Sequence, residues 1–288
     1  MGHVAGSDPA RACHEKLGHI RPAKLQSMVR KGPIAGAAGA ASVRPGVEDR
    51  CLPCLRAKQT RAWVRRGPSP HEGRQAAYPC ELVHIDVVYY RNPTWRGYHY
   101  TLLCTDAATR ERWGEVLPSK GHVAEAYRRY AAWLRTQGDA PSVRVVRLDS
   151  GGEFTSAQFR QFLAEEGTVA QYTSPYTPEH NGVAERTNRA AWDMCRTVML
   201  QSGADTRWWG VCLLNYCLPT LNMYENEATG SSAYYDRRVV APDIRALHPF
   251  GCSASIHVPF ARRTGGNKLA PRSEEGVFLG YSTEGDSY

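Results

Sequence analysis

Residues 81–90 have the sequence ELVHIDVVYY, in which β-branched and aromatic residues surround one aspartate, Asp86. Such a run predicts a β-strand. An aspartate inside an apolar strand is costly to bury unless its carboxylate is paired or bound to a cation. Residues 98–105 (YHYTLLCT) and 112–117 (RWGEVL) follow after turn signals and extend the prediction to a three-strand meander. The stretch therefore predicts a sheet with a functional acid inside it.

Helical and strand patterns alternate in the next part of the chain. The order strand, strand, strand, helix, strand, helix, strand predicts an α/β fold in which helices pack on a mixed sheet. The elements that complete this order are a helix over 121–137 ended by Gly138, a strand over 143–148, a helix over 156–166 capped by Ser156, and a strand over 169–172.

Three acids occupy positions where sheet proteins carry active sites. Asp86 lies inside the first strand, Asp149 directly follows the fourth, and Glu185 begins a long helical segment. After Asp149 comes Ser-Gly-Gly-Glu-Phe, whose paired glycines permit a tight turn that aims the carboxylate. Carboxylate oxygens suit Mg²⁺ or Mn²⁺, and two such ions about 3.5–4 Å apart cleave phosphodiesters. Any one of these acids alone is more simply a surface carboxylate or a helix cap.

A second set of ligand residues lies near the N-terminus. His14 and His19 precede Cys51 and Cys54, a combination that tetrahedral Zn²⁺ prefers. Histidines five positions apart do not stack on one helix face, so we expect the pair to straddle a helix end, with Gly18 permitting the bend. A site closed by four protein ligands is structural, and a module this small needs its metal to fold.

Composition and charge narrow the class of protein. The 288 residues include 36 Lys+Arg and 28 Asp+Glu, a net charge of +8. Residues 1–78 hold 14 basic and 5 acidic residues (+9), whereas 79–288 hold 22 and 23 (−1). The basic stretch around Lys58, Arg61, Arg65 and Arg66 favours binding of a polyanion, or it is a solvated linker.

No run of about 18 apolar residues and no secretory signal occur, and the number of cysteines, 9, is odd. We therefore expect an intracellular protein without a disulfide framework.

The spacing of the acids carries a family resemblance. There are 35 residues between Asp149 and Glu185, and SPYTPEHNGVAERTNRA (residues 174–190) resembles the signature of retroviral-type integrases. Together with the LVHIDV strand and the DSGGEF turn, it is most similar to the integrase region of copia-type LTR-retrotransposon polyproteins. The resemblance implies an RNase H-like core in which Asp86, Asp149 and Glu185 bind divalent metals. It also implies that Asn181 and Gly182 shape the approach to the Glu185 helix and that Arg186 lies beside it.

The flanking parts resemble the same polyproteins. HEKLGH with its downstream CLPC is similar to the GAG-pre-integrase zinc domain, although Cys13 replaces the usual Trp and Ala57 a common Gly. The last residues resemble an SH3-like β barrel, whose Lys268 would touch DNA phosphates or remain a solvated loop charge. The expected domains are a zinc domain at 1–62, a basic Pro/Gly linker at 63–80, a catalytic core with following helices at 81–245, and a truncated SH3-like domain at 246–288.

The resemblance leaves three hypotheses for the function. The first is a DNA integrase that processes DNA 3′ ends and transfers strands with Mg²⁺ or Mn²⁺, stabilised by zinc. Its partners would be double-stranded DNA and further copies of the chain. No membrane is expected among its partners, and the protein would act in the nucleus. The second is an inactive or host-recruited nucleic-acid-binding remnant of a polyprotein, and the third an RNase H-like nuclease. The candidate DNA contacts are Lys58, Arg61, Arg65, Arg66, Asn181, Arg186 and Lys268.

Overall fold

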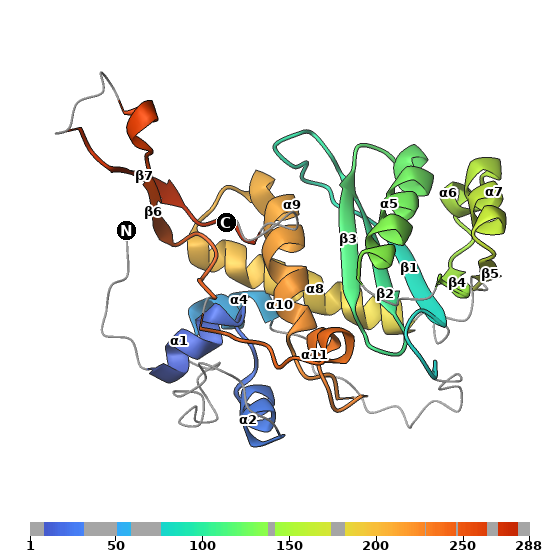
Figure 1. The fold of residues 1–288 in the computed structure, drawn as a ribbon, viewed down its shortest axis with the longest axis horizontal. Coiled ribbons are helices and arrows are strands. Elements are labelled where there is room, and N and C mark those ends of the chain that lie inside the picture. Colours follow the sequence, from blue (N-terminus) through green and yellow to red (C-terminus); the bar gives the residue numbers. More distant parts are fainter. Residues whose placement is uncertain are drawn as a thin grey trace.

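The structure is a computed structural model, and it describes most of the chain. The described residues are 9–31, 51–58, 76–137, 142–173, 182–227, 229–245, 247–263 and 270–281. Figure 1 shows their arrangement, with a sheet at one side, a long helix behind it, and the N-terminal helices at the far end of that helix.

A five-stranded mixed sheet forms the centre of the fold. Its order is β3-β2-β1-β4-β5; β1 pairs antiparallel with β2 and parallel with β4. The predicted mixed α/β core is therefore confirmed, including the order of its elements along the chain. The strands are β1 (Leu82–Tyr89), β2 (Tyr100–Asp106), β3 (Arg112–Leu117), β4 (Val145–Leu148) and β5 (Val169–Tyr172).

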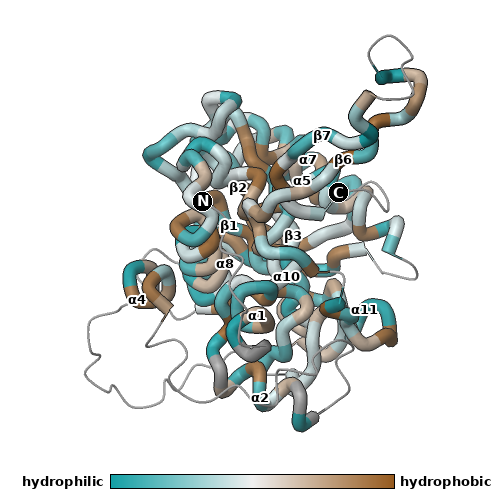
Figure 2. The backbone as a smooth tube through the Cα atoms, turned by 90° about the vertical axis from the view of Figure 1, so that its left-hand side faces the viewer, coloured by the Kyte–Doolittle hydropathy of each residue, from teal (hydrophilic) through white to brown (hydrophobic). Residues whose placement is uncertain are grey.

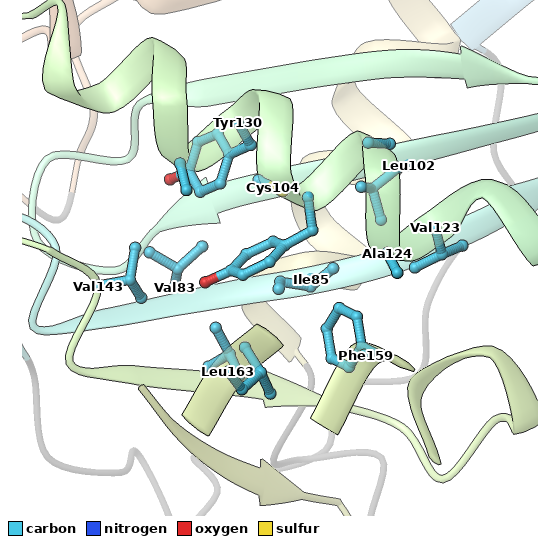
Figure 3. Packing of buried hydrophobic residues seen from close by; sticks show 14 of the residues in the cluster. Val83, Ile85, Leu102, Cys104, Val123, Ala124, Tyr130, Val143, Phe159 and Leu163 are labelled. Atoms are coloured by element: carbon cyan, nitrogen blue, oxygen red, sulfur yellow. The ribbon is translucent and has the colours of Figure 1, made fainter. Parts of the chain in front are cut away.

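Two helices and two short segments pack on one face of the sheet. This face takes alternate residues of β1, Val83 and Ile85, both fully buried, and Figure 3 shows them against Tyr130 and Phe159. Ser156 accepts a hydrogen bond from the backbone N–H of Phe159 and so caps the second helix, as predicted. The elements are η2 (Lys120–His122), α5 (Val123–Arg135), α6 (Gly152–Thr155) and α7 (Ala157–Glu165).

The opposite face of the sheet is covered by α8 (Gly182–Ser202). Its buried stripe, including Ala191, Met194 and Val198, shares a core with Leu103 of β2. Figure 1 shows α8 continuing past the sheet toward α4, so this helix joins the two ends of the molecule. The same core is completed by η4 (Thr206–Trp208), α9 (Trp209–Val211), the π-helical segment η5 (Cys212–Cys217) and α10 (Leu218–Asn222).

The N-terminal helices pack on a segment from near the other end of the chain. Cys13, Leu17 and Leu25 share a small core with Ile244 and Leu247. In Figure 2, α1, α2 and α11 lie at the same end of the molecule. The N-terminal helices are α1 (Pro9–Lys16), α2 (Pro22–Lys31) and α4 (Leu52–Lys58), and α11 (Ala233–Arg238) precedes Ile244 in the chain.

The last described residues form a small sheet of their own. Antiparallel β6 (Ser253–His257) and β7 (Ser273–Val277) flank η6 (Phe260–Arg262), and most side chains of both strands are exposed. Figures 1 and 2 show this hairpin projecting from the body. Within residues 247–263 and 270–281 the only sheet is this two-stranded one, so the expected SH3-like barrel is not confirmed.

No helix among the described residues combines the length and the apolar character needed to cross a membrane.

Candidate active site and metal centre

The strand register sets Asp86 and Asp149 side by side. Parallel β1 and β4 pair at His84 and Arg147, and each aspartate lies two residues further along its own strand. Side chains two apart point to the same face, and neighbouring strands are about 4.8 Å apart. Because Val83 and Ile85 face α5, both aspartates belong to the face that α8 covers. Asp86 is half-buried and Asp149, just past the strand end, is exposed.

Helix α8 brings the third acid to this face. Glu185 lies in its first turn and is exposed, and Asn188, one turn later, donates a hydrogen bond to Oδ2 of Asp86. Burial raises the pKa of Asp86, and the charges of Asp149 and Glu185 raise it further, against the hydrogen bond from Asn188. The charges of Asp149 and Glu185 therefore reach Asp86, as expected for acids that share a cation site.

The Gly-Gly turn positions Asp149 because Gly151, which has no Cβ, lets the Asp149 carboxylate approach closely. The backbone dihedral angles of Gly151 are ordinary ones. Gly151 has φ −58° and ψ 148°, which any residue adopts. Its N–H donates to Asp149 Oδ1 at 2.9 Å, and a Cβ here would lie 2.9 Å from the same oxygen. A Cβ on Gly152 would meet nothing within 4 Å. The glycine requirement is thus one of close approach at Gly151, not of a left-handed turn.

An ion pair lies directly behind this turn. Lys120 Nζ is 2.7 Å from Glu153 Oε1, and the side chain of Glu153 is only 6% exposed. The hydrogen bond to Glu153 raises the pKa of Lys120, and the charge of Asp149 adds to the shift. Lys120 therefore supplies a positive charge at the edge of the acid cluster.

The acids have the donor chemistry of a Mg²⁺ or Mn²⁺ site. All their ligand atoms are hard oxygens. Burial raises the pKa of Asp86 and the charges of Asp149 and Glu185 raise it further, and a bound cation would offset both effects. Among the described residues, the ligand sets whose atoms all lie within 4.8 Å of one another are made of His and Cys, not of these acids. The acid cluster is therefore more open than a closed metal cage.

His14, His19, Cys51 and Cys54 come together in the buried interior of the N-terminal helices. His14 lies in the last turn of α1, and His19 follows a positive-φ Gly18, so the pair straddles the helix end. His19 Nδ1 is 3.1 Å from His14 Nε2 and 3.2 Å from Cys51 Sγ; Cys54 Sγ is 3.4 Å from His14 Nε2. Tetrahedral zinc at ordinary bond lengths gives edges of about 3.3–3.6 Å between such atoms. The four side chains fit zinc in type and in spacing.

Hydrogen bonds on the outer sides of both histidines orient their inner nitrogens toward the other ligand atoms. His14 Nδ1 is 2.8 Å from the carbonyl of Ile20, and His19 Nε2 contacts Oε1 of Gln201 on α8. Each outer nitrogen is then the N–H donor, and the opposite nitrogen keeps its lone pair for a metal. Hydrogen bonds from Cys54 and from the two histidines lower the pKa of the Cys51 thiol, which favours the thiolate that zinc binds.

The candidate DNA contacts are only partly described. Arg186 is exposed in the first turn of α8, beside Glu185. Lys58 is the last residue of α4, and its side chain lies outside the described part. The remaining candidates outside the described residues are Arg61, Arg65, Arg66, Asn181 and Lys268.

Four residues of the two sites were not singled out from the sequence. Asn188 is 102 residues from Asp86, and Gln201 is 182 residues from His19. Lys120 and Glu153 are common surface-type residues whose pairing depends on how the β3–α5 turn meets α6. Only the helical spacing of Asn188, one turn after Glu185, could have indicated a role.

Comparisons with known proteins support the resemblance to retrotransposon integrases. Residues 76–178 match the family model described as integrase core domain. The chain is 28% identical, over 96% of its length, to the retrovirus-related Pol polyprotein from transposon TNT 1-94 of Nicotiana tabacum. The resemblance to the integrase region of retrotransposon polyproteins is confirmed. The match to the integrase core model ends before α8, so Glu185 lies outside the matched segment.

Further relatives extend across the same region. The Pol polyprotein from transposon RE1 of Arabidopsis thaliana is 25% identical over 96% of the chain, and the truncated Ty1-A Gag-Pol polyprotein of Saccharomyces cerevisiae 26% over 81%. The chain spans only about a fifth of these relatives' length: 20%, 18% and 19%. Among solved structures, the HTLV-2 integrase catalytic core domain in complex with magnesium (trimeric form) is similar over 56% of this chain and 99% of that one, with 16% identity and TM-score 0.43.

Proposed function

We propose that the chain is a retrotransposon integrase that processes DNA 3′ ends and joins them to target DNA with Mg²⁺ or Mn²⁺. One observation carries the proposal. Asp86 and Asp149, level on adjacent parallel strands, lie on the sheet face where the first turn of α8 carries Glu185. The family match over 76–178 supports the same reaction class.

Each acid has its own means of positioning. Asn188 holds Asp86 from α8, the N–H of Gly151 holds Asp149, and Glu185 projects from the helix start. The three carboxylates would hold two divalent cations. When bound, one would lower the pKa of the attacking water or 3′-hydroxyl and the other would stabilise charge on the leaving oxygen. The exposure of Asp149 and Glu185 leaves this edge accessible to a DNA backbone.

Zinc has a separate, structural role in this proposal. His14, His19, Cys51 and Cys54 fill a tetrahedral site completely, which leaves no open position for a substrate. The hydrogen bond between His19 and Gln201 ties the zinc site to the helix that carries Glu185. We expect zinc to stabilise the assembly and to take no part in the chemistry.

The remaining expectations follow from the reaction. The substrates would be two double-stranded DNAs, the element ends and the target. Joining two ends at once requires at least two active sites, so we expect a homo-oligomer on DNA. Integration would take place in the nucleus.

The test is strand transfer by zinc-loaded protein on a short duplex that mimics an element end, in Mg²⁺ or Mn²⁺. Glu185→Gln removes the acid, and Glu125→Gln, an exposed position on α5, is the matched control. We expect joined products from wild type and Glu125→Gln and none from Glu185→Gln. If wild type binds DNA and retains zinc but neither joins nor nicks it, the chain is a nucleic-acid-binding remnant and the proposal is wrong.

A further inference from the structure

A cavity of about 650 Å³ lies between the N-terminal helices and the sheet. Its walls come from residues 18–24, the turn between β2 and β3, the first half of α8, and the segment that follows α10. Arg186, the residue that follows Glu185 on α8, is part of the lining. The cationic side chains of the lining are Arg21, Lys24, Arg110, Arg112, Arg186 and Arg189.

Three acids also line the cavity, so six cations and three acids leave a formal charge of +3. These acids interact with groups other than the arginines nearest the sheet. Asp193 pairs with Arg196 at 3.0 Å, and Glu225 lies 3.4 Å from the hydroxyl of Ser27. Burial lowers the pKa of Lys24, and the charges of Glu227 and Glu225 oppose that shift. The acids therefore offset Lys24 rather than the arginines nearest the sheet.

Among the described residues, neither Arg110 nor Arg112 has a carboxylate counter-ion. Each has a buried Nε that makes no hydrogen bond, and Nη1 of Arg112 donates to the Leu221 carbonyl at 3.1 Å. In the described part of the chain, no carboxylate lies within 4.0 Å of Arg110, Arg112 or Arg186. Leaving a buried charge unpaired is strongly unfavourable. An anion in the cavity would remove this penalty.

The electrostatics of the arginines agree with this arrangement. Burial and the charge of Arg110 lower the pKa of Arg112 to about 10, so Arg112 still carries its proton at neutral pH. Burial and the charge of Arg186 likewise lower the pKa of Arg110, against a weaker opposite effect of Asp106. Asp106 is already engaged by the N–H groups of Cys80 and Thr109, both at 2.7 Å. Arg110 therefore repels both Arg112 and Arg186, and Asp106 offsets only part of this repulsion.

The backbone of Arg110 adds an independent observation. Its φ is 64°, in the left-handed region that favours glycine over a residue with a side chain. An arginine here costs stability in the turn between β2 and β3, whereas its side chain lines the cavity. Strained residues of this kind occur at binding sites, where the side chain is needed in one place.

We propose that this cavity binds phosphate groups, through Arg110, Arg112 and Arg186. Guanidinium groups bind phosphate oxygens in pairs of parallel hydrogen bonds, which suits a converging set of arginines. The proposal deepens the proposed integrase function: a DNA strand whose reacting phosphodiester lies at Glu185 carries further phosphates to the adjoining cavity. A free polyphosphate offers the same chemistry, and the experiment separates the two sources.

Two variants remove charge with little risk to the fold. Arg110→Gly relieves the left-handed backbone, and Arg112→Met keeps the length of the buried aliphatic chain. Two controls match them. Val239→Gly relieves an exposed residue with φ 54°, and Arg160→Gln removes one exposed arginine from α7 on the opposite face of the sheet. All four variants are made in the 288-residue chain and loaded with zinc.

The first arm measures binding of inorganic tripolyphosphate from the rise in melting temperature, at fixed ionic strength. We expect wild type and both controls to be stabilised, and each cavity variant to bind about tenfold more weakly, the effect of one charge-assisted contact. Unchanged tripolyphosphate binding in Arg110→Gly and Arg112→Met would overturn the proposal. Unfolding of both variants without ligand would also overturn it, because the arginines would then be structural.

The second arm measures binding of the element-end duplex by fluorescence anisotropy across a salt series. If DNA is the source of the phosphates, each cavity variant weakens binding and lowers the salt slope by about one, and tripolyphosphate competes with the duplex. If DNA binding is unchanged while tripolyphosphate binding is lost, the cavity serves a free polyphosphate. Failure of strand transfer in wild type, with tripolyphosphate binding intact, would refute the integrase function and leave the phosphate site standing.

Discussion

At the scale of single residues, Gly151 has the clearest steric constraint of the acid cluster. A Cβ there would lie 2.9 Å from Asp149 Oδ1 and equally close to the carboxylate of Glu153. Because the backbone of Gly151 suits alanine, the substitution disturbs only these neighbours. We predict that Gly151→Ala lowers strand transfer by about tenfold or more, since small displacements of catalytic groups are costly.

The adjacent Gly152 is the matched control for this prediction. A Cβ on Gly152 meets no atom within 4 Å, so Gly152→Ala should leave strand transfer as in wild type. Melting temperatures of both variants test whether the effect is local. Equal strand-transfer activity of the two variants would contradict this prediction. It would show that the carboxylates of Asp149 and Glu153 can move away from the added Cβ, and that the close approach at Gly151 does not affect strand transfer.

At the scale of elements, the cap of α7 is the simplest to test. The side-chain oxygen of Ser156 accepts from the N–H of Phe159, and Phe159 is fully buried under the sheet. We predict that Ser156→Ala lowers the free energy of unfolding by about 1 kcal/mol, the usual cost of losing an N-cap. Urea denaturation measures this, and exposed Gln158→Ala in the same helix should cost only a fraction of it. A loss as small as that of Gln158→Ala would mean that the cap contributes nothing.

How far the sequence predicts each element depends on whether its signal is local. The β-branched and aromatic run around Asp86 and the turn signals give β1 to within a residue at each end, and β5 coincides with its predicted range. The π-helical form of η5 has no local signal, since 211–221 has the pattern of an ordinary helix. The same limit applies to the sites. The acids and the zinc ligands can be recognised from their spacing in the sequence. Asn188 and Gln201 cannot, because their partners Asp86 and His19 are 102 and 182 residues away.

At the scale of the whole molecule, α8 connects two parts that have separate cores. The sheet core with Val83 and Ile85 includes no residue of the N-terminal helices, which share their own core with Ile244 and Leu247. Contacts of α8 that join the parts include Gln201 with His19, Arg196 with the carbonyl of Ala57 at 2.9 Å, and Met194 against Gly18. A Cβ on Gly18 would lie 2.7 Å from the sulfur of Met194, so this interface is closely packed.

This arrangement predicts how the molecule responds to loss of zinc. Without the metal, the buried His14, His19, Cys51 and Cys54 lose the interaction that holds α1 and α4 together, and metal-dependent modules unfold in that state. Chelation should therefore abolish hydrogen-exchange protection in α1, α4 and the last turns of α8, while β1, β2 and α5 stay protected. Hydrogen exchange with and without chelator measures this by segment, and His14→Ala with zinc present should give the pattern of the chelated protein. Loss of protection throughout the sheet on chelation would instead mean that both cores unfold as one unit, with α8 transmitting the change to the strands that carry Asp86 and Asp149.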